Sequence, residues 1–228
     1  MIRTATYFAM FFVCLANVQA SAQVTARSYS DGGVATARAS GVGRTNLLAE
    51  SAASGGGRAD ARIQGSGLYG GVATGTSLAV TDGGRAISRA RTDASGRGAW
   101  SHVDSIAGSV RGSAVSQSNA SARGRGQAIS RSTAIGNYGR AISRSDADAH
   151  GLRGGRALAE SESLADAYFG TARSRSRVQA HADFGGRAVG QGDAIGLGWG
   201  RRARADVHVQ STGRFGGRSH ASASHLDW

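Results

Sequence analysis

The side chains best suited to proton transfer or metal binding, the histidines, are few and scattered along the chain. No cysteine lies near them at the spacing of a metal site, and the closest grouping, His220 and His225 near Asp227, matches no ligand pattern. We therefore expect no metal site and interpret the histidines as exposed polar residues. There are six of them: His102, His150, His181, His208, His220 and His225.

Serine and glycine are abundant, but they form no catalytic or phosphate-binding motif. Gly65, Ser66 and Gly67 lie in repeat-type sequence and not at the strand-to-helix turn that presents a nucleophilic serine. The glycine-rich run from Gly190 to Gly200 lacks the lysine and the following helix of a phosphate-binding loop. The sequence thus predicts neither an enzyme nor a cofactor site.

Arginine supplies all of the basic charge. The 27 basic residues include no lysine, and the formal net charge is +12. Guanidinium groups bind carboxylates in a bidentate manner and stack on aromatic rings. The run from Arg123 to Gly126 is similar to the RGG segments of RNA-binding proteins, although it also fits the repeat as a turn. We expect attraction to anionic polymers or surfaces and no specific nucleic-acid partner.

The N-terminus has the pattern of a secretory leader. Arg3 precedes an apolar run from Ala5 to Ala16, and Ala20, Ser21 and Ala22 form a small-residue cleavage motif. Residues 1–22 are therefore predicted to be a signal peptide that is removed before Gln23, which makes the protein secreted and extracellular. The apolar run is shorter than the roughly 20 residues that span a bilayer, so we expect no transmembrane segment after cleavage.

Two further consequences follow from secretion. Cys14 is the only cysteine and leaves with the leader, so the mature chain contains no disulfide. Asn119 begins the sequon Asn119, Ala120, Ser121 and is a candidate glycosylation site.

The elements that position these residues are clearest between Gly155 and Gly186. Small residues take every second position, and they have odd residue numbers in the first half and even residue numbers in the second half. A period of two predicts β-strands with one face made only of small side chains. The small positions are Ala157, Ala159, Ser161, Ser163, Ala165 and Ala167, then Ala172, Ser174, Ser176, Val178, Ala180 and Ala182.

A hairpin explains the change of parity. If Phe169 and Gly170 form a two-residue loop, Ala167 faces Ala172, Ser163 faces Ser176 and the two small faces coincide. The same register predicts three ion pairs between the strands, each contributing about 0.2 to 1 kcal/mol. These pairs are Asp166 with Arg173, Glu162 with Arg177, and Arg156 with Asp183.

The same unit recurs from residue 23 to residue 228, so we expect one repetitive, β-rich region. Glycines, often paired, precede each alternating stretch and recur about every 13 to 17 residues. The near-identical stretches Ala86 to Arg89, Ala128 to Arg131 and Ala141 to Arg144 are the sharpest copies. The chain has 36 glycines and no proline, and large aliphatic residues are scarce, which favours either disorder or a sheet without an oily core. The alternation favours the sheet.

Two all-β architectures fit this repeat. One is an antiparallel meander with Gly-Gly turns, folded or stacked so that its Ala, Ser and Gly faces meet. The other is a β-solenoid, in which the near-identical segments stack in parallel register. We prefer the meander, because the parity flip between neighbouring units suits hairpins.

The leader, the Gly, Ala and Ser bias, the alternation and the Gly-Gly punctuation together resemble the repetitive secreted structural proteins of arthropods, such as silk, eggshell and cuticle matrix proteins. The resemblance covers nearly all of the chain from Gln23 onward. It implies an extracellular structural protein that self-associates, which we expect to occur through small-residue β-faces. The alternative is a cationic, Gly-rich defence protein that binds microbial surfaces.

Overall fold

The computed structural model describes residues 21–68, 71–152, 156–184, 186–199, 202–214 and 218–227, and these form strands with no helix. Of the predicted leader, only Ser21 and Ala22 lie within this part, where they begin β1. The all-β class is therefore confirmed. Cys14 lies outside the described residues.

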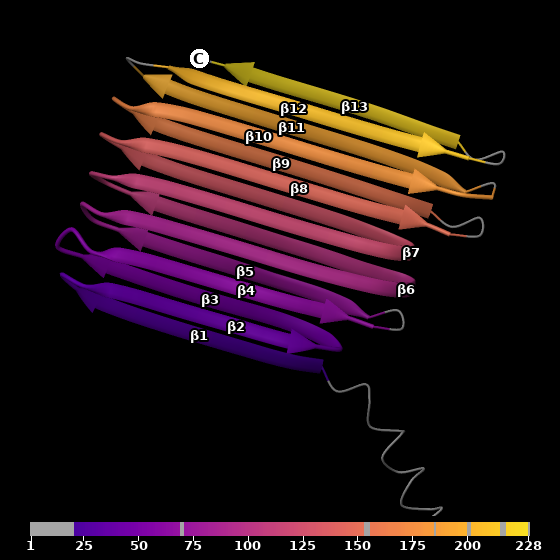
Figure 1. Ribbon diagram of the computed structural model, residues 1–228, viewed down its shortest axis with the longest axis horizontal. Helices are drawn as coiled ribbons and strands as arrows, with labels where there is room; N and C mark the ends of the chain where they lie inside the picture. The colour runs from indigo at the N-terminus through magenta and orange to yellow at the C-terminus, as the bar shows by residue number, and fades with distance from the viewer. Residues whose placement is uncertain are drawn as a thin grey trace, which may run out of the picture.

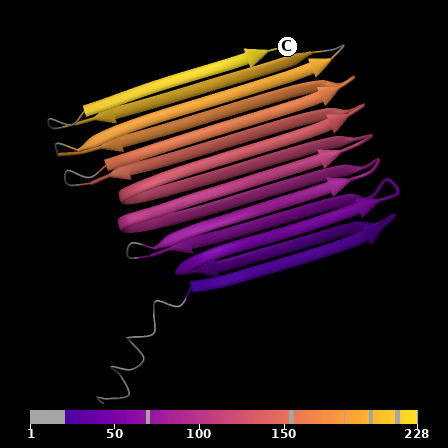
Figure 2. The same ribbon diagram turned by 180° about the vertical axis from the view of Figure 1, so that it is seen from behind.

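The strands form two layers, which Figures 1 and 2 show from opposite sides. Layer 1 contains β2 (Val34–Val42), β4 (Arg58–Gly67), β8 (Arg140–Gly151), β10 (Thr171–Ala182) and β12 (Ala203–Gly213). Layer 2 contains β1 (Ser21–Asp31), β3 (Arg44–Ser54), β5 (Val72–Thr81), β9 (Arg156–Tyr168), β11 (Arg187–Trp199) and β13 (Arg218–Asp227).

Two long strands pass through both layers. The first parts of β6 (Arg85–Ser109) and β7 (Ser113–Asn137) pair in layer 1, and their second parts pair in layer 2. The backbone crosses between the layers near Gly96 and Gly124, which have φ values of 105° and 110°. Residues with a side chain rarely adopt such values, so glycine is suited to these corners.

Every strand pairing in the described chain is parallel, and each strand pairs with strands one turn away in the sequence. The result is a β-solenoid of about six turns. The solenoid that the sequence left as an alternative is confirmed, and the preferred antiparallel meander is not what the chain forms. A β-arch, in which the chain turns so that two strands face each other across layers, produces the same parity flip as a hairpin. The loop at Phe169 and Gly170 is such an arch, since β9 pairs with β7 and β11 and not with β10.

Near-identical segments stack as the solenoid requires. Ala86 pairs with Ala114, which in turn pairs with Ala141, so the copies beginning at Ala86 and Ala141 occupy the same row. The copy beginning at Ala128 lies in layer 2, where Ala128 pairs with Ser101 and Ala159. Identical residues in one row keep the strands in register, because a slip of one residue would reverse every side chain.

The core lies between the two layers and consists mainly of alanine and serine. The predicted small faces of β9 and β10 point into it, and Ala159, Ala165 and Ala182 are fully buried. Serine hydroxyls cross the gap at regular intervals: Ser88 donates to the carbonyl oxygen of Ser77 at 2.6 Å, and Ser116 donates to that of Ser105 at 2.6 Å. A buried hydroxyl without a partner destabilises a fold, so these bonds make a serine-lined core tolerable.

Glycines stack at the arches that lead into layer 1. Arg140 donates its backbone N–H to the carbonyl oxygen of Gly112 at 3.0 Å, and Thr171 donates to that of Gly139 at 3.1 Å. A Cβ atom on Gly139 would collide with the same Gly112 carbonyl, so the turns can stack closely only if this position lacks a side chain. The glycines that recur along the sequence therefore lie at the arches between strands.

Candidate interaction surfaces

The two outer faces of the solenoid differ in charge. The layer 1 strands, with the parts of β6 and β7 up to residues 97 and 125, contain fifteen arginines and five aspartates. The layer 2 strands, with the remaining parts of β6 and β7, contain six arginines and eight carboxylates. The positive charge of the chain is thus concentrated on layer 1, a surface suited to anionic partners.

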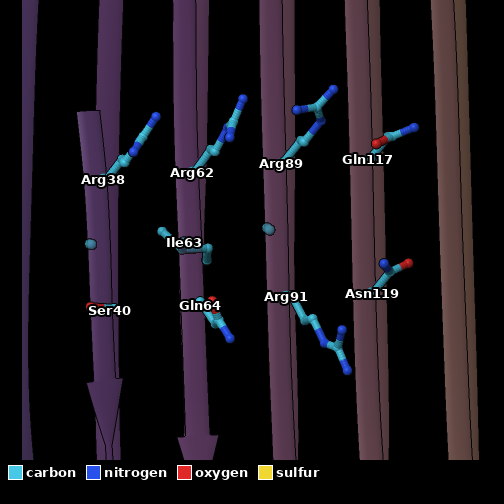
Figure 3. Close-up of a pocket in the computed structure, with 11 residues that line it drawn as sticks. Arg38, Ser40, Arg62, Ile63, Gln64, Arg89, Arg91, Gln117 and Asn119 are labelled. Carbon is cyan, nitrogen blue, oxygen red and sulfur yellow. The ribbon is translucent and has the colours of Figure 1, made fainter. Parts of the chain in front are cut away.

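Stacking in register converts single arginines into a row on this basic face. Arg38 pairs in register with Arg62, and Arg62 pairs with Arg89, on β2, β4 and β6. Figure 3 shows that the three side chains extend in the same direction along their strands, whereas Arg91 extends the opposite way. A groove of about 470 Å³ lies between them, with Gln117 and Asn119 along its continuation on β7.

Some arginines on this face are neutralised by a carboxylate two residues away. Arg62 lies 2.8 Å from Asp60, and Arg91 lies 3.0 Å from Asp93. Within the described chain, Arg38 and Arg89 form no ion pair. Repulsion between neighbouring guanidinium groups in the row is relieved when an anion binds across them, and this effect weakens as salt is added.

Layer 2 presents a mixed apolar and acidic outer face. One row consists mainly of aliphatic side chains, with Ile106 and Leu226 at 38% and 46% exposure. Glu160, Glu162 and Asp166 lie on the same face. The row runs through Leu78, Ile106, Thr133, Leu164, Ile195 and Leu226.

The three predicted ion pairs are not formed, because β9 and β10 lie in opposite layers and their charged side chains point away from each other. Glu162 instead bonds Arg131 of β7 at 3.1 Å, within layer 2. Asp183 lies 3.0 Å from His181. Within the described chain, Asp166, Arg156, Arg173 and Arg177 form no ion pair.

The histidines are paired more often than the sequence predicted. His102 lies 3.2 Å from Asp104, and His150 lies 3.3 Å from Asp148. The rings of His150 and His181 are neighbours, with centroids 5.5 Å apart. Spacings of two residues between charged groups on one strand face could have revealed these pairs, because such residues point the same way. The described residues contain no group of three or more potential metal ligands.

Asn119 lies on the outer face of layer 1 and is exposed. With its amide nitrogen turned toward Asp146, it donates a hydrogen bond to Asp146 Oδ2 at 3.1 Å. An outward position leaves room for a glycan, so the sequon remains a candidate site.

The ends of the solenoid form a further surface. In the described chain, β1 pairs only with β3 and β2 only with β4, and at the other end β12 pairs only with β10 and β13 only with β11. Each end therefore carries two strands with an unpaired edge, a feature that promotes association with another strand.

Comparison with protein families, curated proteins and solved structures finds no match for this chain. No helix in the described part is long and apolar enough to cross a membrane.

Proposed function

We propose that the chain is a secreted structural protein that self-associates into an extracellular material of the silk, eggshell or cuticle-matrix kind. The leader pattern and the compositional resemblance support secretion and a structural role. The regular solenoid adds support, since it repeats one supersecondary unit along an axis and can in principle be extended by adding further units.

The proposed contact between molecules differs from the one expected from the sequence. The small-residue faces of layers 1 and 2 already pack against each other inside one chain, where Ala159 and Ala165 are fully buried. Except at the two ends of the solenoid, they are not available to a second molecule. Self-association must therefore use another surface.

The observation that carries the proposal is that, among the described residues, two strand edges are unpaired at each end. Soluble β-proteins commonly protect such edges with prolines, charges or covering segments. The described residues of β12 and β13 include no proline, and Ala221 and Ala223 of β13 are exposed although they occupy inward positions. Backbone groups and small apolar side chains are thus presented together.

The experiment is a dilution series of the purified chain beginning at Gln23, followed by light scattering, electron microscopy and fibre diffraction. A structural protein gives particles that grow with concentration and a repeat of about 4.7 to 4.8 Å along the particle axis. A chain that stays monomeric at all concentrations contradicts the proposal.

A second function is supported by the arginine row of layer 1. Arg38 and Arg89 lack an ion-pair partner in the described chain, and a face with an excess of arginine attracts anionic lipids or cell-wall polymers. This favours the alternative of a cationic defence protein. That function requires binding and killing by the soluble monomer, and it requires that added salt weaken the binding.

A further inference from the structure

The two ends of the solenoid leave complementary sets of backbone hydrogen-bonding groups without a partner in the described chain. At the C-terminal end these groups belong to inward residues, and at the N-terminal end they belong to outward residues. Arg218, at the start of β13, donates its backbone N–H to the carbonyl oxygen of Gly186 on the β11 side. Because the bonding direction alternates along a strand, the N–H groups of Ser219, Ala221 and Ala223 point away from β11 to the open edge. These are residues whose side chains point inward.

At the N-terminal end, the free backbone N–H groups belong to residues whose side chains point outward. Gly32, just after β1, donates its N–H to Ser54 at the end of β3. The N–H groups of Thr25, Arg27 and Tyr29 therefore point to the open edge, and these side chains point outward. Inside the solenoid, inward residues of one strand bond outward residues of the next, as Ala172 does when it donates to Arg202. Joining the two ends reproduces that pattern.

The layer that contains the first and last described strands determines how a second copy must be oriented. Both the first strand, β1, and the last, β13, lie in layer 2 (Figures 1 and 2). If a second copy followed by translation alone, two layer 2 strands would follow each other and layer 1 would lack a strand. A rotation of half a turn about the solenoid axis brings β1 of the second copy into line with layer 1. It also reverses the strand direction, so that the new pairings are parallel.

We propose that this protein forms open-ended filaments by head-to-tail addition of copies, each rotated by half a turn. In this contact β12 pairs in parallel with β1 of the next copy, and β13 pairs with β2 of that copy. The inference rests on the proposed structural function and specifies the contact. A head-to-tail contact that does not close on itself generates a filament.

The side chains at the two ends fit this contact. Val207 and Val209 of β12 point inward but remain half-buried, as do Val24 and Ala26 of β1, whereas inward residues in the middle of the stack are fully buried. Two conditions determine the register of the contact: inward side chains must stay inward, and the arches of both copies must lie at the same edge. In this register Val207 lies beside Val24 of the next copy. The same register brings Arg214 to the next copy's Asp31, a pair of opposite charges.

The alternative contact between two C-terminal ends pairs the edge strands antiparallel and gives a closed dimer. The two contacts are distinguished by blocking one end at a time. Ala221→Pro with Ala223→Pro removes two N–H groups from the C-terminal edge, and Thr25→Pro with Tyr29→Pro removes two from the N-terminal edge. Proline is tolerated where the lost N–H faces the open edge.

Head-to-tail addition predicts that each double variant alone is monomeric, because one end of every contact is blocked. An equimolar mixture of the two forms heterodimers and nothing larger, since only one productive contact remains. A small amount of either variant added to the unmodified chain shortens the filaments. Sedimentation velocity and electron microscopy measure these outcomes, and circular dichroism verifies that each variant is folded.

Self-dimerisation of the Thr25→Pro and Tyr29→Pro variant would overturn the proposal, because it would show a contact between C-terminal ends. Filaments of the variants as long as those of the unmodified chain would also overturn it, while leaving a structural function intact. An unmodified chain that never assembles would refute both. If a proline variant does not fold, Ala223→Glu tests the same contact by placing a charge at an inward position that is exposed only at the end.

Discussion

Ser163 of layer 2 is bonded to layer 1 on both sides, which makes it a central element of the core. Its hydroxyl donates to Ser143 Oγ at 2.9 Å and accepts the backbone N–H of Arg175 at 3.3 Å. Its carbonyl oxygen accepts the hydroxyl of Ser174. One small side chain thus connects the arches before and after it.

Replacing Ser163 by leucine is expected to destabilise the solenoid much more than replacing it by alanine. Leucine overfills a gap lined by alanine and serine, at about 1 to 3 kcal/mol or more. Alanine fits the space and loses only the hydroxyl bonds, about 1 kcal/mol. Thermal unfolding followed by circular dichroism measures both. Equal stability of the two variants would show that the layers are not closely packed at Ser163.

Gly139 should be much less tolerant of alanine than Gly108. A Cβ on Gly139 meets the carbonyl group of Gly112, whereas a Cβ on Gly108 meets only the side chain of Val80 at 4.0 Å. We expect Gly139→Ala to lower the free energy of unfolding by about 2 to 4 kcal/mol and Gly108→Ala to change it by less than about 0.5 kcal/mol. Denaturant unfolding of the two variants provides the comparison, and similar losses would contradict the stacked arches.

A double-mutant cycle distinguishes the solenoid from a hairpin register. Arg131 and Glu162 lie 3.1 Å apart in one layer, and both are about half exposed. Replacing each by alanine, singly and together, should give a coupling energy of about 0.2 to 1 kcal/mol. The same cycle for Glu162 and Arg177 should give none. Coupling only in the second cycle would support the hairpin.

The sequence predicted which residues line the core but not how the strands are connected. Alternation placed Ser161, Ser163, Ser174 and Ser176 inward, and all four are buried between the layers. The facing pairs are displaced by two residues from the hairpin register, since Ser176 bonds Ser161 and Ser174 bonds Ser163. The alternation of small and large residues shows which face of a strand points inward. It does not show how the strands are connected, because both a hairpin and an arch bring two such faces together.

The ion pairs could not be predicted locally because they depend on the partner strand. In a hairpin the partner of Glu162 is Arg177 on the strand that follows it in sequence, whereas in the solenoid it is Arg131, one turn earlier. The sequence did contain a signal for the solenoid, namely the repeated segments that begin at Ala86 and Ala141. Those segments lie in one row of layer 1, and identical residues in one row are a consequence of parallel stacking in register.

The arginine row of layer 1 should govern binding to anionic surfaces. Arg38→Gln with Arg89→Gln removes two charges that no carboxylate of the described chain neutralises. On vesicles rich in phosphatidylserine we expect binding to weaken by about 1 kcal/mol for each charge removed, roughly thirty-fold in total. Co-sedimentation at low ionic strength measures it, and raising the salt should reduce the difference.

The matched control for this prediction is Arg131→Gln with Arg27→Gln, which removes the same charge from layer 2. Both of these arginines are bonded to a glutamate, Arg131 to Glu162 and Arg27 to Glu50. Their loss also changes the net charge by two but leaves the basic face intact. If attraction depended on net charge alone, both double variants would lose binding equally, and the row of Arg38, Arg62 and Arg89 would have no special role. A larger loss for the layer 1 variant shows that the surface binds through its stacked guanidinium groups.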